Sequence, residues 1–191
     1  AAAASRVPPR AVSVWIALIR GINVGGHVMV AMADLRAFFG ALGFRDARTL
    51  LQSGNVVFSG TAQTDAELEV RLEKEAAKRL GLRTSFLVRS AAEWADVVAR
   101  NPFPNEAQRD PSRLHVMFLK SAPAAPAVEA LQAAVTGPEV VRAGARHLYI
   151  TYPDGAGRSK LTGALIEKKL GTTGTARNWN TVLKLAALAE V

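Results

Sequence analysis

Cysteine is absent from this 191-residue sequence, and histidine occurs only three times. Without thiols the chain can form no disulfide and has no thiolate nucleophile, which favours an intracellular protein. The three histidines, His27, His115 and His147, are far apart and lack the spacing of a zinc site. We therefore predict no metal site, and no sequence motif leads us to expect a cofactor.

Long hydrophobic runs are also lacking. The longest strongly apolar stretch is Val14–Ile19, which Arg20 ends, whereas a membrane-spanning helix needs about 20 apolar residues. Residues 1–9 are rich in alanine and proline, contain Arg6, and do not have the apolar region and cleavage site of a signal peptide. We predict a cytoplasmic protein without a membrane segment, in which residues 1–10 form a disordered tail.

Acidic residues are few relative to basic ones, 16 against 24, which gives a net charge of +8. Residues 140–191 contain eight Lys or Arg and three acids, a net of +5, whereas residues 1–139 contain 16 and 13, a net of +3. A basic C-terminal third would attract phosphate groups or nucleic acid. Arginine substituted freely on a solvated surface explains the same excess, so both interpretations stay open.

Residues 11–100 predict a first α+β lobe with the element order βαββαβ, the ferredoxin-like pattern, followed by one short helix. Alternating and β-branched apolar residues indicate strands, and apolar residues three and four apart indicate helices. Thr64 and Glu67 have the spacing of a capping box, and Ser53-Gly54-Asn55 is typical of a hairpin turn. The strands are expected at 12–20, 47–51, 56–58 and 84–88, and the helices at 32–42, 64–80 and 91–100.

Residues 101–112 are polar and contain proline, which predicts a connection between two lobes. Residues 113–191 then repeat the order βαββαβ and end with one more helix. Strands are expected at 114–120, 139–142, 147–152 and 173–178, and helices at 124–135, 159–170 and 180–189. The predicted fold is α+β, with two ferredoxin-like lobes, of which the second has an extra C-terminal helix.

Four stretches of the sequence resemble the signature stretches of one uncharacterised family. They are residues 18–26 (LIRGINVGG), 51–58 (LQSGNVVF), 152–162 (YPDGAGRSKLT) and 175–182 (TARNWNTV). The chain is thus similar to the bacterial family called domain of unknown function 1697, and the resemblance covers nearly the whole chain. It implies a compact α+β protein, widespread in bacteria, and it assigns no activity and no catalytic residue.

A first group of polar residues comprises Arg20, Asn23, Gln52, Ser53 and Asn55. In a ferredoxin-like sheet the first and third strands are antiparallel neighbours, so the end of one lies beside the start of the other. A guanidinium, carboxamides and a hydroxyl gathered there could bind a planar polar ligand. Alternatively, these side chains serve the turn and satisfy loop carbonyls.

A second group forms a glycine-rich loop before the helix expected at 159–170, and its members are Gly155, Gly157, Arg158, Ser159 and Lys160. With Ser159 as N-cap, the free N–H groups and the positive end of the helix dipole would favour an anion. The loop lacks the spacing of a Walker A motif. The alternative is a capped helix with solvated basic side chains.

The end of the last strand is expected to extend this second group. That strand would run parallel to the strand before the loop, which places Arg177 and Asn178 beside it. We therefore predict that Arg158, Lys160 and Arg177 point into one pocket. Alternatively, Arg177 pairs with a nearby acid. Trp179, which follows, is expected in the core, with Asn180 or Thr181 as a helix cap.

No catalytic motif is present, since the chain lacks a Gly-x-Ser-x-Gly elbow and a Cys–His pair. We expect non-catalytic binding of a phosphate-bearing ligand, either nucleic acid or a nucleotide-like metabolite, through the basic C-terminal site. One alternative is a metal-independent enzyme acting on an anionic substrate, with Arg20, Arg158, Lys160 and Arg177 as electrostatic stabilisers. Another is a scaffold whose basic face meets an acidic protein partner.

Overall fold

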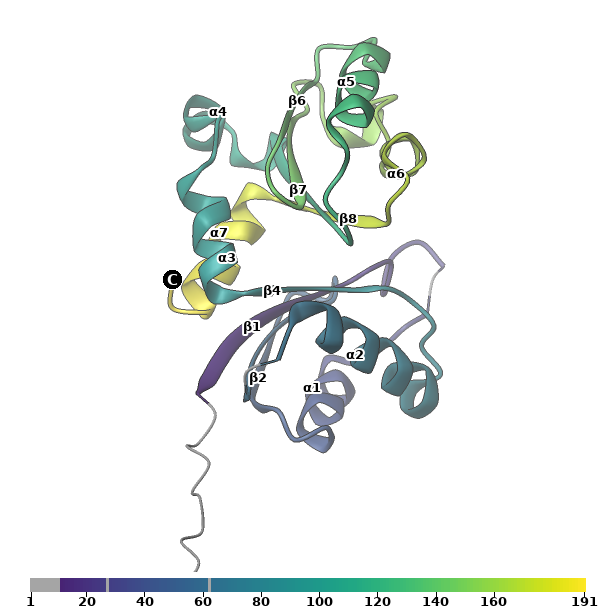
Figure 1. The fold of residues 1–191 in the computed structure, drawn as a ribbon, viewed down its shortest axis with the longest axis vertical. Helices are drawn as coiled ribbons and strands as arrows, with labels where there is room; N and C mark the ends of the chain where they lie inside the picture. Colours follow the sequence, from purple (N-terminus) through teal and green to yellow (C-terminus); the bar gives the residue numbers. More distant parts are fainter. Residues whose placement is uncertain (1–10, 27, 62) are drawn as a thin grey trace, which may run out of the picture.

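Two four-stranded antiparallel sheets, stacked one above the other, form the computed structural model of this protein (Figure 1). The structure describes residues 11–26, 28–61 and 63–191, so the tail expected at 1–10 lies outside the described residues. Helices cover the outer face of each sheet, and two more lie at one edge of the space between the sheets. The α+β prediction with two ferredoxin-like lobes is confirmed.

The N-terminal lobe contains the first sheet, in the strand order β2-β3-β1-β4. Helices α1 and α2 cover one face of this sheet, where their apolar sides meet a core rich in phenylalanine. Thr64 and Glu67 form the expected capping box of α2, and Gly81 ends it in a left-handed conformation. The elements are β1 (Val12–Ile19), α1 (Met32–Ala41), β2 (Arg45–Leu50), β3 (Asn55–Thr61), α2 (Asp65–Leu80) and β4 (Phe86–Ser90).

The C-terminal lobe repeats this plan, with the strand order β6-β7-β5-β8. Helices α5 and α6 cover the outer face of its sheet and enclose a second apolar core. The helix α6 begins at Gly163, with Thr162 as its cap, rather than at the expected Ser159. The elements are β5 (Leu114–Leu119), α5 (Ala125–Ala134), β6 (Val140–Ala143), β7 (His147–Thr151), α6 (Gly163–Leu170) and β8 (Gly174–Asn178).

The inner faces of both sheets share one core with two helices, α3 (Ala91–Ala99) and α7 (Trp179–Leu188). Strand residues alternate between faces, so Ile16 and Leu18 of β1 reach this shared core, as do Val116 and Phe118 of β5. Figure 1 shows α3 and α7 side by side at the edge of the space between the lobes. Neither sheet therefore offers a bare inner face to a ligand.

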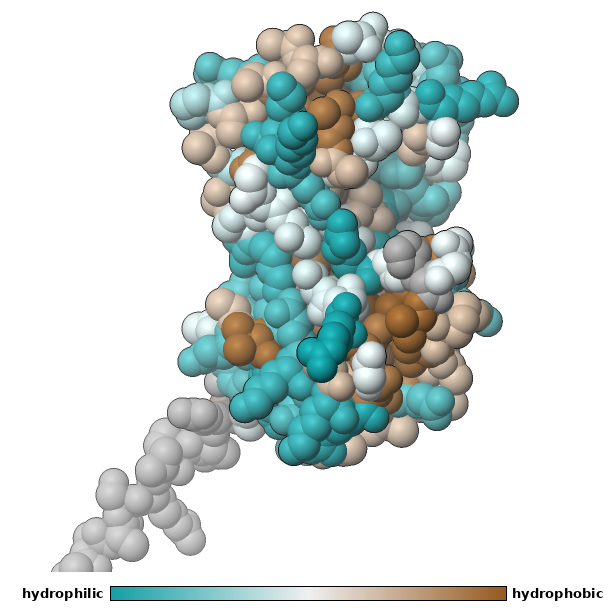
Figure 2. Space-filling view, turned by 90° about the vertical axis from the view of Figure 1, so that its right-hand side faces the viewer, coloured by the Kyte–Doolittle hydropathy of each residue, from teal (hydrophilic) through white to brown (hydrophobic). Residues whose placement is uncertain are grey.

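The connection expected at 101–112 contains a short helix, α4 (Pro104–Arg109), and a 3-10 turn at Pro111–Arg113. Seen from the side, the molecule is narrowest where the lobes meet, and hydrophilic side chains lie along this waist (Figure 2). Within the described part of the chain, no helix has the length and apolar character that crossing a membrane requires.

Candidate functional site

The loop between β7 and α6 borders a pocket of about 300 Å³ in the C-terminal lobe. Its charged and polar lining comes from Glu139, Asp154, Arg158, Ser159 and Lys160, and we call it the loop pocket. The sequence predicts Arg158, Ser159 and Lys160 at a ligand site, whereas it predicts Glu139 only as the start of a strand and does not single out Asp154 as a ligand-binding residue. The Glu139 side chain lines the pocket, and its carboxylate accepts a hydrogen bond from Ser159 of the loop.

Ser159 does not cap α6 as the sequence suggested. Its hydroxyl accepts a hydrogen bond from the Leu161 N–H at 2.9 Å and donates one to a carboxylate oxygen of Glu139. Thr162, three residues later, accepts from the Leu165 N–H and starts the helix. The helix N-terminus therefore lies beyond the loop, and part of the loop's own hydrogen-bonding capacity is used by a turn at 155–159.

Opposite charges line the loop pocket. The side chains of Arg158 and Lys160 are exposed and make no hydrogen bond or ion pair with the residues that the structure describes. Tyr152 is buried, and its hydroxyl donates to the carbonyl of Leu161, a lining residue of the loop pocket, at 3.0 Å. Burial, and secondarily the carboxylate of Glu139, raises the pKa of Tyr152 to about 12, so this phenol stays protonated. The uncommitted cations are the groups here that can bind an anion.

Arg177 does not reach the loop pocket, and the predicted convergence of Arg158, Lys160 and Arg177 is wrong. Strand β8 does run parallel to β7, but β5 lies between them. Arg177 also pairs across the ladder with Val116, which belongs to the shared inner core, and ladder partners point to the same face. Arg177 therefore faces the N-terminal lobe, whereas the loop pocket lies on the side of α5 and α6.

The guanidinium of Arg177 instead joins the first polar group. It donates to the Asn55 side-chain oxygen at 2.6 Å and to the backbone carbonyls of Ser53 at 3.0 Å and Ile19 at 3.3 Å. Burial lowers the pKa of Arg177 to about 10, and among the described residues no carboxylate pairs with the guanidinium to offset this effect. The expected acid partner is thus replaced by neutral oxygens at the end of the first sheet.

The remaining members of the first polar group are committed to local structure or to the lobe interface. Leu18 and Asn55 pair across β1 and β3, as predicted, so the two loops meet. Asn23 donates to the Gln52 carbonyl at 2.9 Å, and buried Asn55 donates to the Ser53 hydroxyl at 3.0 Å. Arg20 forms a two-pronged ion pair with Glu167 of α6, at 3.0 and 2.9 Å.

Gly54 shows why this turn is tight. Its φ of +77° is a left-handed conformation, and a Cβ placed there would lie 2.9 Å from the Cβ of Ile19.

At the end of β8, Asn178 caps α7 by accepting from the Thr181 N–H, so the cap expected at Asn180 or Thr181 is wrong by at least two residues. Trp179 is 4% exposed, which confirms its place in the core.

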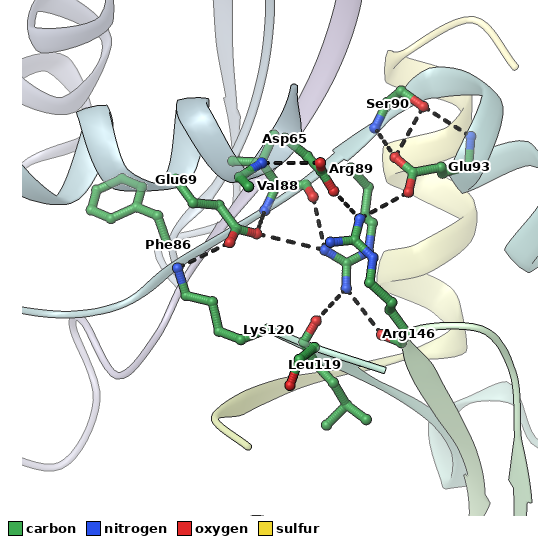
Figure 3. A network of polar contacts seen from close by, with 12 residues as sticks. Asp65, Glu69, Phe86, Val88, Arg89, Ser90, Glu93, Leu119, Lys120 and Arg146 are labelled. Atoms are coloured by element: carbon green, nitrogen blue, oxygen red, sulfur yellow. Dashed lines mark hydrogen bonds and ion pairs between the residues drawn. The ribbon is translucent and has the colours of Figure 1, made fainter. Parts of the chain in front are cut away.

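The sequence did not predict a network of charged side chains that joins the two lobes (Figure 3). Arg89 of β4 is 2% exposed, donates to the carbonyls of Leu119 and Arg146 across the interface, and lies 3.7 Å from Glu69. Burial, and then the nearby Arg146 charge, lowers the pKa of Arg89 to about 10. The signal was present, because Arg89 follows three apolar strand residues, but the strand was expected to stop at Val88.

Two cations of the C-terminal lobe complete this interlobe network. Lys120 pairs with Glu69 at 3.1 Å and Glu73 at 2.5 Å, and Arg146 pairs with Asp65 and with Glu93. Beside the network, Arg146 and α3 border a second pocket, which contains the buried His147. Among the residues that the structure describes, no three or more His, Cys, Asp or Glu side chains cluster in a way that could hold a metal ion.

Comparisons with known proteins agree with this architecture. The family described as "Protein of unknown function (DUF1697)" matches residues 12–149, so the stretches 152–162 and 175–182 lie after the matched part. The fold is similar to that of the conserved bacterial protein SP0830 from Streptococcus pneumoniae, with a TM-score of 0.74 and 24% identity, over 94% of this chain and 99% of that one. No curated protein matches the sequence. Because the family match covers most of the chain, the protein belongs to the DUF1697 family of proteins of unknown function.

Proposed function

We propose that this protein binds a small phosphate-bearing metabolite in the loop pocket without transforming it. One observation carries the proposal: Arg158 and Lys160 border the same pocket of about 300 Å³, and neither is committed to a protein partner among the described residues. Hydrogen bonds from guanidinium and ammonium groups to phosphate oxygens are stronger than neutral ones. Two such donors at one concave site are the usual basis of phosphate recognition.

The carboxylates of the pocket favour a metabolite over nucleic acid. Glu139 and Asp154 would repel a chain of phosphates, but their oxygens can accept hydrogen bonds from the hydroxyls of a sugar. The inner sheet faces, which many ferredoxin-like RNA-binding domains use as stacking platforms, are covered here by α3 and α7. A ribose phosphate or a mononucleotide therefore suits the loop pocket better than a polynucleotide.

Thermal shift with inorganic phosphate, ribose 5-phosphate and a set of mononucleotides tests the proposal, because a ligand that binds only the folded state raises its melting temperature. Calorimetry should then give an affinity that falls roughly tenfold to hundredfold in Arg158→Gln or Lys160→Gln, the range for losing a charged hydrogen bond. Lys184→Gln, an exposed lysine on α7 outside the pocket, is the matched control.

Three results would contradict the proposal. Equal affinity in Arg158→Gln, Lys160→Gln and Lys184→Gln would remove the loop pocket as the site. Tight binding of an oligonucleotide at about 50 mM salt that weakens steeply as salt rises would favour nucleic acid instead. Chemical conversion of the metabolite during incubation with the protein would favour the enzymatic alternative. Asp154 and Glu139 are the carboxylates beside Arg158 that could then act as acid or base.

A further inference from the structure

A second pocket, of about 310 Å³, lies between the two lobes, and we call it the interlobe pocket. One side of the lining comes from Glu93 and Asp96 of α3, three positions apart on the helix, and from Arg100, which caps its C-terminal end. The β6–β7 turn contributes Arg146, which His147 follows, and Arg89 of β4 completes the charged lining. A molecule bound here would contact both lobes at once.

His147 is the unusual member of this pocket. The residue is only 9% exposed, and neither ring nitrogen has a hydrogen-bond partner among the described residues. Its ring contacts are aromatic, with Phe118 and Tyr149, and its Nε2 is enclosed against Gly144. A neutral imidazole has one N–H donor and one acceptor nitrogen, and buried polar groups are normally paired. Because Nε2 is enclosed by the chain, Nδ1 is the ring nitrogen that a molecule in the pocket could reach.

The arginines of the pocket also keep free donors. Arg146 uses only its Nη2 for Asp65 and Glu93, which leaves its Nη1 and Nε without a side-chain or backbone partner among the described residues. Arg100 is exposed, and its side chain makes no hydrogen bond or ion pair with them. Glu93 is already held by Ser90 and Arg146, so Asp96 is the one carboxylate of the lining left to oppose an anion.

The charge that acts on His147 is positive. Burial and then the Arg89 charge lower the pKa of His147 to about 4, so the imidazole is neutral at physiological pH. A neutral imidazole can donate to an oxyanion from one nitrogen at no cost in charge. We propose that the interlobe pocket binds a small oxyanion, a phosphate or a carboxylate, through Arg100, the free edge of Arg146 and His147. This site is separate from the loop pocket and does not depend on the proposed function.

Imidazole NMR tests this assignment directly. In a buffer free of both anions, the ¹H–¹⁵N ring signals of His147 are identified by their loss in His147→Leu. Titration with inorganic phosphate, and separately with acetate, should shift these signals in a saturable way, and the tighter of the two defines the preferred oxyanion. In Arg100→Gln the dissociation constant should rise roughly tenfold or more, because a charged hydrogen bond is lost. Arg109→Gln, an exposed arginine on α4 outside the pocket, should leave it unchanged.

The same titration in Arg158→Gln separates the two sites. A His147 shift that persists there, while binding at the loop pocket is lost, supports an independent interlobe site. No His147 shift with either anion overturns the inference, whatever happens at the loop pocket. An equal dissociation constant in wild type and Arg100→Gln also overturns it, because the anion would then bind without the residue that holds its charge. Since Arg100 is exposed, Arg100→Gln is expected to fold normally.

Discussion

Basic side chains differ between the lobe interface and the loop pocket: they bind the other lobe at the interface and have no side-chain partner at the pocket. At the interface, Arg89, Arg146 and Arg177 are wholly or partly buried, and each donates to carboxylates or carbonyls of the other lobe. At the loop pocket, Arg158 and Lys160 are exposed and uncommitted. The same residue types therefore stabilise the fold in one region and stay available to a ligand in the other. Net charge alone does not distinguish the two roles.

The largest effect is expected from breaking the interface at its most buried cation. Replacing Arg89 with Ala removes one of the two cations that accompany buried Glu69, and it takes a guanidinium donor from the carbonyls of Leu119 and Arg146 across the interface. Removing one partner of a buried pair typically costs about 3–5 kcal/mol, so the free energy of unfolding should fall by that amount. Urea denaturation measures it, and Arg109→Ala provides the exposed control. If the free energy of unfolding fell by less than about 1 kcal/mol, Arg89 would stabilise the protein no more than an exposed ion pair does, which would contradict this expectation.

Arg177→Ala tests the corrected place of this arginine. The variant loses hydrogen bonds to Asn55, Ser53 and Ile19 across the interface, and we expect the free energy of unfolding to drop by about 1.5–3 kcal/mol. Its affinity for phosphate ligands should equal that of wild type, in contrast to Arg158→Gln. If the variant were as stable as wild type but bound anions more weakly, the assignment of Arg177 to the interface would be wrong.

Acid should weaken the interface through His147. The unfolded chain takes up this proton near pH 6.5, whereas in the folded protein burial and Arg89 lower the pKa to about 4. The unfolded state therefore binds more protons between these values, so the stability is full above pH 6.5 and falls as the pH drops toward 4, by roughly 1–3 kcal/mol.

His147→Leu should remove that part of the pH dependence while costing little at pH 7, because no hydrogen bond is lost. His115, whose pKa burial also lowers, remains in both proteins, so the difference between their pH profiles isolates His147. Parallel profiles from pH 6.5 to 4, measured by urea denaturation, would contradict the expectation.

The smallest effect concerns the loop pocket. Glu139→Gln removes a negative charge beside Arg158 and Lys160 and keeps an oxygen that can accept from Ser159. Phosphate affinity should rise roughly twofold to fivefold, the scale of a partly exposed charge pair, with no large change in stability. Calorimetry at low salt measures it. Weaker binding in this variant would mean that the carboxylate contacts the ligand rather than opposing it.

Much of the fold was predictable because its signals are local. The capping box of Thr64 and Glu67, the glycine that ends α2 and the alternating strands each depend on a few neighbouring residues. Antiparallel pairing of β1 and β3 also followed from the element order, so the meeting of Asn23 with Gln52 was foreseeable. The start of α6 was misplaced because Ser159 and Thr162 are both good caps by residue type, and only the path of the loop selects Thr162.

The sequence by itself determined the elements, their order and the excess of basic residues, since these depend on residue type and short spacing. Only the tertiary structure decided which cations are committed. Arg177 faces the other lobe because β5 lies between β7 and β8 and because alternation along β8 points it inward. Arg89, Lys120 and Arg146 meet their carboxylates across sequence separations of 20 to 81 residues, and no local pattern encodes such contacts. The interlobe pocket likewise exists only because two lobes pack together.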